Sequence, residues 1–531
     1  MGKHKVVLFY PPYDGPPLSA PLCLLALASP LLQDGFDVKL IDNITSPDFE
    51  TEILRETSDA LCLGISVLTG PTIGSAVRVA KAVKKARPSL PIIFGGWHPT
   101  LATEQTLRPD FVDAVVRGPG ELTFLEVAQR LAAGHELHGV HGVSFKDKAG
   151  IQRHEPERRV ANINDLPAPA FHLANFDAYA STVGYRQLSY TTSVGCPYAC
   201  NYCTDMVFYN RRFNAYRAER VVNELADLVT RYAIQEVALF DSNFLVDIKR
   251  AIAIARGIVD SGVKFRWDFQ ASTDFLWRMS DDDVRLLGQS GVSHMGFGTE
   301  SASQSVLKLM NKHHQNVEQM IQTARKAHLA DIRVTFNVIL GYPGETEADR
   351  QQTFCIMSDI AREYSNVSFS PNIFTPYPGI PIWPQLKEMG LREPQSLEEW
   401  QTLALGRNVL PWLQGEELRR LRRSLEYFLL NNQIRKATQN KAWLRKRFRQ
   451  ALGVPIRWRI GKNRYSFPWE LWISRVAQRV VTRRSLLTGQ KLAERMQELV
   501  DGLFDWRTAV FCRHSLNADL TTESQRHRKA E

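Results

Sequence analysis

The sequence predicts an α/β protein in three parts: an N-terminal doubly wound, Rossmann-like sheet, then a parallel βα barrel of the partial TIM type, then a mostly helical C-terminal region. Short apolar segments alternate with helical segments up to about residue 400, and the alternation then stops. The length of 531 residues and the hydrophobic content of 44% are enough for more than one core. We expect domains at 1–145, 187–400 and 401–531, with a linker at 146–186.

Five apolar segments predict five strands in the first part: Lys5–Tyr10, Val38–Asp42, Asp59–Leu68, Pro91–Phe94 and Asp113–Arg117. Helices are expected at Leu22–Gln33, 71–85 and Leu122–Leu131. The third strand is apolar throughout, which is typical of a strand covered on both faces. In open parallel sheets ligands bind beyond the carboxyl ends of the strands. Three glycine turns fall there, at 66–70, 95–98 and 118–120, although each by itself is also compatible with an ordinary strand-to-helix turn.

Six further strands are expected after the linker: Gln187–Ser193, Glu236–Phe240, Phe265–Ala271, His294–Phe297, Arg333–Leu340 and Val367–Ile373. Helical segments such as Ala218–Tyr232 and Asp282–Gln289 lie between them. Six βα units over this length fit a complete or partial parallel barrel, whose chemistry takes place at the carboxyl ends of its strands.

The cysteines point to a metal site. Cys196, Cys200 and Cys203 are spaced C-x3-C-x2-C directly after an expected strand, whereas the other four of the seven are scattered. Three thiolates on one short loop can ligate a [4Fe–4S] cluster, and a fourth ligand is missing, since no Cys or His occurs from 204 to 293. A structural zinc site requires four ligands, so zinc is the weaker alternative. Because an odd cysteine count is a poor disulfide framework, and no signal peptide or membrane-spanning run is found, we expect a reducing cytoplasm.

This loop resembles the signature of the radical S-adenosylmethionine (SAM) superfamily, C-x3-C-x-Φ-C, with Tyr202 at the aromatic position. The resemblance implies that the three cysteines hold the cluster and that SAM chelates its open iron. One electron from the cluster then cleaves SAM to a 5′-deoxyadenosyl radical, with Tyr202 near the adenine. An electron donor of the flavodoxin or ferredoxin kind is implied as a partner.

Further motifs follow in the order of that family. Asp241 ends the second barrel strand, where relatives bind the methionine amino group, although Ser242 replaces a second acid common there. Glu300, in a G-x-E-S/T-like segment, is expected at the ribose hydroxyls, which a carboxylate can bind as an acceptor. Gly341 lies in a loop that resembles the backbone segment beside adenine. No catalytic residue is assigned.

A doubly wound sheet ahead of such a barrel resembles the cobalamin-binding subgroup of the superfamily. The similarity covers residues 5–400, and the sequence lacks the D-x-H-x-x-G motif that supplies an axial histidine elsewhere. Cobalamin is therefore expected between the glycine turns, without a histidine from that motif on cobalt, and His98 is expected to line the groove. A nicotinamide site is the weaker alternative, because no G-x-G-x-x-G follows the first strand. The residues expected at cobalamin are Ser66, Thr69, Gly70, Gly95, Gly96, Gly118 and Glu121.

The expected function is C-methylation of an unactivated carbon by a cobalamin-dependent radical SAM enzyme. Radical cyclisation or oxidation of a hydrophobic substrate without methyl transfer stays open. A non-catalytic Fe–S or cobalamin protein is disfavoured by the three-cysteine count. A tRNA methylthiolase is disfavoured by the N-terminal sheet and by the lack of three further cysteines there.

One segment carries the positive charge of the chain. Between Arg435 and Arg484 fifteen Lys and Arg face one acid, Glu470, and this +14 leaves −4 for the rest of the net charge of +10. Trp443, Trp458, Trp469 and Trp472 lie in the same segment. Basic residues with interspersed Trp and Phe are typical of membrane-interface segments. Contact with the inner face of a membrane, and so a lipid-like small-molecule substrate, is one interpretation; helices that cap the barrel are another, and a nucleic-acid partner is a third.

Overall fold

The computed structural model describes residues 4–13, 19–403, 410–438 and 443–472, and for 433–438 and 443–452 it describes the backbone alone. Contacts divide the chain into two compact units. The first comprises residues 1–296, 329–332 and 376–404, and the second comprises 297–328, 333–375 and 405–531. The domain limits expected from the sequence remain predictions.

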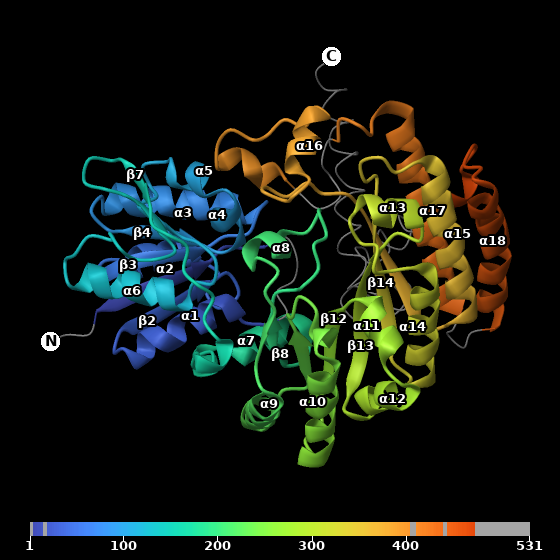
Figure 1. Cartoon of the computed structure of the whole chain (residues 1–531), viewed down its shortest axis with the longest axis horizontal. Helices are drawn as coiled ribbons and strands as arrows, with labels where there is room; N and C mark the ends of the chain where they lie inside the picture. Colours follow the sequence, from blue (N-terminus) through green and yellow to red (C-terminus); the bar gives the residue numbers. More distant parts are fainter. Residues whose placement is uncertain (1–3, 14–18, 404–409, 439–442, 473–531) are drawn as a thin grey trace, which may run out of the picture. The chain divides into compact units, whose positions relative to one another are not determined.

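The N-terminal part of the first unit is built on a seven-stranded sheet with the order β2-β1-β3-β4-β5-β6-β7 (Figure 1, blue to cyan). Its strands are β1 (Lys5–Tyr10), β2 (Asp37–Asp42), β3 (Ala60–Ser66), β4 (Ile92–Gly95), β5 (Ala114–Val116), β6 (Val143–Lys146) and β7 (Gln152–His154). The first five pair in parallel. The order 2-1-3-4-5 is that of a doubly wound fold, so the Rossmann-like prediction is confirmed.

Strand β1 lies between β2 and β3 and is buried on both faces. Val6 and Leu8 pack into a cluster with helices α1 (Leu22–Gln33) and α6 (Glu121–Ala132). Phe9 points the other way and stacks on Phe49 of α2 (Phe49–Glu56), with ring centroids 5.3 Å apart. Side chains alternate across a strand, so a continuous apolar run is what a sheet covered on both sides requires.

A second sheet has six strands in the order β15-β14-β13-β12-β11-β8. Their bounds are β8 (Gln187–Tyr190), β11 (Glu236–Leu239), β12 (Arg266–Ala271), β13 (Val292–Glu300), β14 (Arg333–Leu340) and β15 (Val367–Ile373). The pairs β8–β11, β11–β12 and β14–β15 are parallel. Strand order therefore follows the chain, as in a βα barrel that is open at one side. A separate short ladder joins β9 (Ser193–Val194) to β10 (Asn214–Ala215) in antiparallel pairing.

Helices connect the strands and extend the chain beyond them. In the first unit these are also α3 (Thr72–Ala86), α4 (Trp97–Leu101), α5 (Thr103–Leu107), α7 (Phe176–Val183), α8 (Thr204–Phe208), α9 (Ala218–Tyr232), α10 (Ile248–Ser261), α11 (Thr273–Arg278), α12 (Asp281–Gln289) and α16 (Trp383–Glu388). The others are α13 (Gln304–Leu309), α14 (Val317–Leu329), α15 (Glu347–Glu363), α17 (Gly415–Thr438) and α18 (Trp443–Lys462). The prediction of a mostly helical C-terminal region is confirmed for the described residues. Within that part of the chain, no helix has an apolar stretch of the length a bilayer requires.

Four elements in particular differ from the expectation. Strands β6 and β7 extend the first sheet in antiparallel pairing beyond the five expected strands. Helix α7 forms inside the expected linker, where Asn175 caps its first turn by accepting the N–H of Ala178 at 3.0 Å. Strand β13 covers Val292–Glu300 rather than 294–297. Each element is short or carries polar residues within its apolar pattern, so hydrophobic periodicity gives only a weak signal for it.

Candidate functional site

The three cysteines lie on the loop between β9 and α8, which follows the first strand of the second sheet. Gly195 precedes them with a φ of +77°, and a β-carbon there would lie 1.9 Å from the carbonyl oxygen of Arg212. Only glycine fits this close approach of two backbone segments. Cys203 N–H donates to the carbonyl oxygen of Cys200 at 3.2 Å, which closes a tight turn.

The surroundings of the thiols fit an iron–sulfur cluster. Cys196 Sγ accepts hydrogen bonds from the side chain of Asn243 at 3.8 Å and from the backbone of Tyr198, and Cys203 Sγ accepts one from the backbone of Asp205. Such N–H contacts hold and tune cluster thiolates. Burial raises the pKa of the Cys203 thiol to about 12, so the bound metal must supply the driving force for its deprotonation.

No three His, Cys, Asp or Glu side chains converge on a single metal-ion position in the described residues. The thiolates of a [4Fe–4S] cluster need no such convergence, because each binds a different iron. Tyr202 is half-buried on the same loop. Its place beside adenine stays a prediction.

Asp241 holds the backbone at the end of β8. Its buried carboxylate accepts the N–H of Thr192 at 2.6 Å, the Thr192 hydroxyl at 2.5 Å and the Ser193 hydroxyl, and Arg250 lies 3.9 Å away. Burial raises the pKa of Asp241, and the hydrogen bonds from Ser193 and Thr192 oppose this rise. The assignment of Asp241 to the methionine amino group is untested, and in this structure its oxygens are engaged by the protein.

A second carboxylate lies beside the position where the sequence lacks one. Ser242 Oγ donates to Asp205 Oδ1 at 2.7 Å, and Asp205 Oδ2 is buried without a partner. Burial raises the pKa of Asp205. Asp205 is two positions after Cys203 on α8, and sequence reasoning missed it because its partner Ser242 is 37 positions away, after β11.

One cavity of about 740 Å³ lies in the first unit. Its lining comes from the carboxyl ends of β1, β3, β4 and β5 and also from residues around the cysteine loop. Residues expected at cobalamin that line it are Ser66, Gly95, Gly96, Gly118 and Glu121. From the second sheet and its loops come Ser189, Thr191, Ser193, Val194, Phe208, Tyr209, Phe240 and Ser242. The cavity therefore extends from the residues expected at cobalamin to the neighbours of the cysteine loop, although its lining includes none of the three cysteines, Tyr202 or Asp241.

Aromatic side chains form part of this lining, and sequence reasoning did not select them. Trp97, at the start of α4, packs on Phe208 of α8 with centroids 4.2 Å apart, and Tyr209 lies 6.0 Å from Trp97. Phe240 is 65% exposed although it belongs to the cavity wall. Large apolar surface inside a cavity is typical of a ligand site.

Glu121 is the acidic group of the glycine-turn set. It begins α6, and burial raises the pKa of its carboxyl. The neighbouring Cys23 lines the same cavity, its Sγ is 3.5 Å from Ser66 Oγ, and burial raises its pKa as well. Burial thus disfavours the charged form of both groups in this part of the wall.

Three residues of the first sheet do not line the cavity. Gly70 has a φ of +114°, and a β-carbon there would lie 2.6 Å from the carbonyl oxygen of Leu403. Thr69 Oγ1 lies 3.0 Å from His98 Nδ1, and His98 is fully buried against Trp400. The groove-lining role expected for His98 is therefore wrong for this structure. Contact of Thr69 and Gly70 with the cofactor remains untested.

In the second unit, Glu300 is paired with a lysine that sequence reasoning missed. Lys312 Nζ donates to Glu300 Oε1 at 2.9 Å, and both side chains are buried. Glu300 has a φ of +59°, a strained left-handed conformation for a residue with a side chain. Such outliers persist where the surroundings fix them, and they gather at functional sites.

The loop that holds Gly341 is fixed on both sides of its backbone. Gly341 N–H donates to Glu345 Oε2 at 2.5 Å, and its carbonyl oxygen accepts Trp412 Nε1 at 3.0 Å. Burial raises the pKa of Glu345 to about 7, although Arg350 opposes this rise. With φ at +72° and Leu413 close to the position of a β-carbon, only glycine fits at 341.

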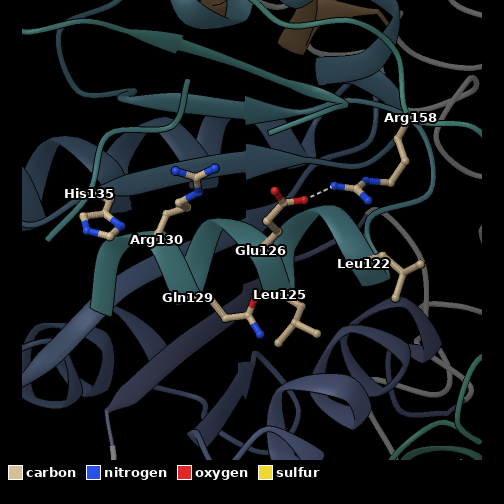
Figure 2. A pocket seen from close by; sticks show the side chains of 7 residues that line it. All are labelled: Leu122, Leu125, Glu126, Gln129, Arg130, His135 and Arg158. Carbon is tan, nitrogen blue, oxygen red and sulfur yellow. Dashed lines mark hydrogen bonds and ion pairs between the residues drawn. The ribbon is translucent and has the colours of Figure 1, made fainter. Parts of the chain in front are cut away.

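A smaller hollow of about 510 Å³ lies along α6 and shares Leu122 and Arg158 with the large cavity. Figure 2 shows Arg158 directed at Glu126 across this helix, with Arg130 and His135 at its far end. Because Glu126 already neutralises Arg158, we assign this hollow no separate role.

Comparison with known proteins matches both halves of the site. Residues 190–354 match the radical SAM superfamily, and residues 5–128 match the B12 binding domain. The chain is therefore a radical SAM protein that carries a cobalamin-binding domain in front of the radical SAM core. This is the make-up of a cobalamin-dependent radical SAM enzyme, whose cofactors are a [4Fe–4S] cluster, SAM and cobalamin.

Individual proteins extend the comparison. An uncharacterised methyltransferase of Pyrococcus horikoshii is 29% identical over 71% of this chain and 82% of its own length. An anaerobic magnesium-protoporphyrin IX monomethyl ester cyclase of Cereibacter sphaeroides is 24% identical over 69% of this chain and 60% of its own. The structure of the cobalamin-dependent SAM radical enzyme OxsB with aqua-cobalamin has the same fold, with a TM-score of 0.70 and 16% identity over 98% of this chain and 81% of that one.

Proposed function

We propose that this enzyme transfers a methyl group to an unactivated carbon of a small-molecule substrate. The observation that carries the proposal is the single cavity whose walls come from the cobalamin-binding sheet and from the surroundings of the cysteine loop. A substrate in that cavity would face both cofactors at once. When bound, the cluster and SAM supply hydrogen abstraction, and cobalamin supplies the methyl group.

The chain's own residues give the cavity its properties. Cys196, Cys200 and Cys203 would hold the cluster at one end. Trp97, Phe208 and Phe240 line the space with apolar surface, which excludes water from reactive species.

Cobalamin would be held without a histidine ligand, because no histidine belongs to the described residues that line the cavity. Cobalt(II) bound to the full chain should show no superhyperfine coupling to a histidine nitrogen in electron paramagnetic resonance. Such coupling would contradict this mode of binding.

Ring formation or oxidation without methyl transfer is the second candidate, and the likeness to the Cereibacter sphaeroides cyclase favours it. Incubation of the reconstituted enzyme with methyl-labelled SAM, a reductant and cell extract separates the two. Methylation predicts a product that carries the label. Cleavage of SAM with an unlabelled product of lower hydrogen content would support the second candidate instead.

Radical SAM chemistry needs a reductant, and we propose a flavodoxin- or ferredoxin-like donor. Replacing the chemical reductant in the same assay by each purified donor in turn would test this.

We also propose that the substrate is lipid-like, because the cavity wall is largely apolar. Adding single candidate lipids to the assay in place of the cell extract would test that substrate class.

A further inference from the structure

The described end of the chain carries an unusual surface. Five of its large apolar side chains are exposed within 19 residues: Val454, Trp458, Phe467, Trp469 and Trp472. Phe467 is 83% and Trp472 66% exposed. Isolated exposed apolar residues are ordinary, but a concentration of this kind marks an interaction surface.

Helix α18 presents one face of this surface. The exposed positions 454, 457, 458, 461 and 462 follow the 3-1-3-1 spacing of a single helical face, whereas Ile456 and Ile460 are buried. Figure 1 shows α18 beside α17 and α15 in the second unit, and both contacts are present in the structure. The face opposite Ile456 and Ile460 therefore has no partner from these two helices.

The exposed aromatics beyond α18 are held in place by a buried ion pair. Arg459 Nε donates to Glu470 Oε1 at 2.7 Å, and Tyr427 donates to Glu470 Oε2 at 2.8 Å. Arg459 also donates to the carbonyl oxygens of Ser466 at 2.6 Å and Phe467 at 3.0 Å. The backbone that carries Phe467 is thus fixed, and its φ of +54° is a strained value for a phenylalanine.

The same ion pair means that the one acid of this segment does not compensate its exposed cations, and the nearby Glu347 is already paired with Arg420. Glu470 is the one acid among the fifteen Lys and Arg of residues 435–484, and it is 2% exposed and neutralised by Arg459. Arg457, Lys462 and Arg464 are exposed, and the described residues offer them no ion-pair partner. Of the cations counted earlier, Lys441, Arg475, Arg479, Arg483 and Arg484 lie outside the described residues.

We propose that the surface formed by Val454, Arg457, Trp458, Lys462, Arg464, Phe467, Trp469 and Trp472 docks on a bilayer that contains anionic lipids. Uncompensated cations match the charge of anionic head groups, and Trp and Phe are the side chains that enter the boundary with the acyl chains. A nucleic-acid partner fits less well, because the spacing of these aromatics matches none of the common RNA-binding motifs. The proposal stands independently of the reaction, so each can fail alone.

Flotation of the full reconstituted enzyme with vesicles tests it, using phosphatidylcholine alone and with increasing phosphatidylglycerol. We expect binding that rises with phosphatidylglycerol and falls with salt. Replacing Arg457, Lys462 and Arg464 together by Gln should weaken binding about a hundredfold and flatten its dependence on salt, since each cation near an anionic surface contributes about fivefold.

Replacing Trp458, Phe467 and Trp472 together by Ser separates insertion from charge. We expect at least about a tenfold loss of binding and loss of tryptophan quenching by brominated lipid, with the salt dependence kept. Trp277→Ser is the matched control, because Trp277 is exposed on α11 and should leave binding unchanged. Cleavage of SAM checks that each variant is folded.

Three outcomes would overturn the proposal. The first is equal binding to vesicles with and without phosphatidylglycerol. The second is a change of oligomeric state in the Ser variant, measured by analytical ultracentrifugation without lipid, because the surface would then join two copies of the chain. The third is that the enzyme binds a tRNA pool but not vesicles, and that the Gln variant no longer binds the tRNA.

Discussion

Asn243 Nδ2 donates a hydrogen bond to Cys196 Sγ across 3.8 Å. The same amide accepts the backbone N–H of Ser272 at Oδ1 over 3.3 Å, and Asn243 is buried. One side chain thus links the cysteine loop to the residue that follows β12. The two contacts also fix which way the amide points, because a flipped amide would present its oxygen to the sulfur.

We predict that Asn243→Ala lowers the reduction potential of the cluster and costs about tenfold in activity. An N–H···S bond stabilises the more negative, reduced cluster, and loss of a partner behind a metal ligand has typical effects of this size. Redox titration followed by electron paramagnetic resonance measures the potential. Asn175→Ala is the control: it removes a helix cap on α7 and should leave the potential unchanged.

Cys196→Ala, Cys200→Ala and Cys203→Ala should each abolish SAM cleavage. The cluster is expected to have only these three protein ligands, and we expect it to need all of them. Cys355→Ala is the matched variant: Cys355 is a half-buried thiol on α15 that contacts Gln351 and lies outside the loop. Iron content and 5′-deoxyadenosine formation are the readouts. Full activity of the Cys200→Ala enzyme would contradict the assignment.

Lys312→Met should raise the KM for SAM more than it lowers kcat, since we propose that Lys312 positions Glu300 for the ribose. Removing one partner of a buried pair leaves the negative charge of Glu300 without its lysine and costs about 3–5 kcal/mol of stability. The double variant Lys312→Met, Glu300→Gln removes that charge, so it should recover stability but not KM. If both stability and KM recover together, the pair is structural and the positioning role is wrong.

The second sheet shows which features of the fold and the site can be predicted from the sequence. Its six strands were predictable because short segments with apolar residues alternate regularly with helical segments, and C-x3-C-x2-C is specific enough to place the cluster. Asn243, Asp205 and Lys312 were not. The contact that makes each of them relevant to the site is with a residue 12 to 47 positions away, namely Cys196, Ser242 or Glu300. Local periodicity carries no information about such pairs.

At the glycine turns, the sequence predicted more ligand contacts than the cavity lining includes. Their place at one sheet edge was predicted correctly, but the same pattern grouped Gly70 with Gly96. In the structure Gly96 lines the cavity and Gly70 lies against the carbonyl oxygen of Leu403. Both need a positive φ, so the residue type alone does not separate a ligand contact from a packing contact.

Gly96→Ala should weaken cobalamin binding by at least about tenfold. Its φ is +96°, and a β-carbon would lie 3.1 Å from Ser66 Oγ and from the carbonyl oxygen of Val67, so the cavity wall must shift. Gly134→Ala is the matched control, since Gly134 has a φ of +72° with nothing within 4 Å of a β-carbon. Both variants bear the cost of about 1 kcal/mol or more for a left-handed alanine, but only the first should lose affinity. Equal affinity in titrations followed by the cobalamin spectrum would remove Gly96 from the site.

His98 should make the enzyme less stable in acid. Burial lowers the pKa of His98 to about 3 from its usual 6.5, so as pH falls the unfolded chain takes up the proton first. The stabilising contribution is complete above pH 6.5 and is lost as pH falls toward 3, by about 1.4 kcal/mol for each pH unit. The unfolding free energy is measured with urea at pH 7 and at pH 5. The decrease that His98 causes between these two pH values should be absent in His98→Asn. Thr69→Val removes the hydrogen bond to Nδ1 but keeps the burial, so it should retain the loss. If Thr69→Val abolished the acid sensitivity as well, the hydrogen bond and not burial would be its cause.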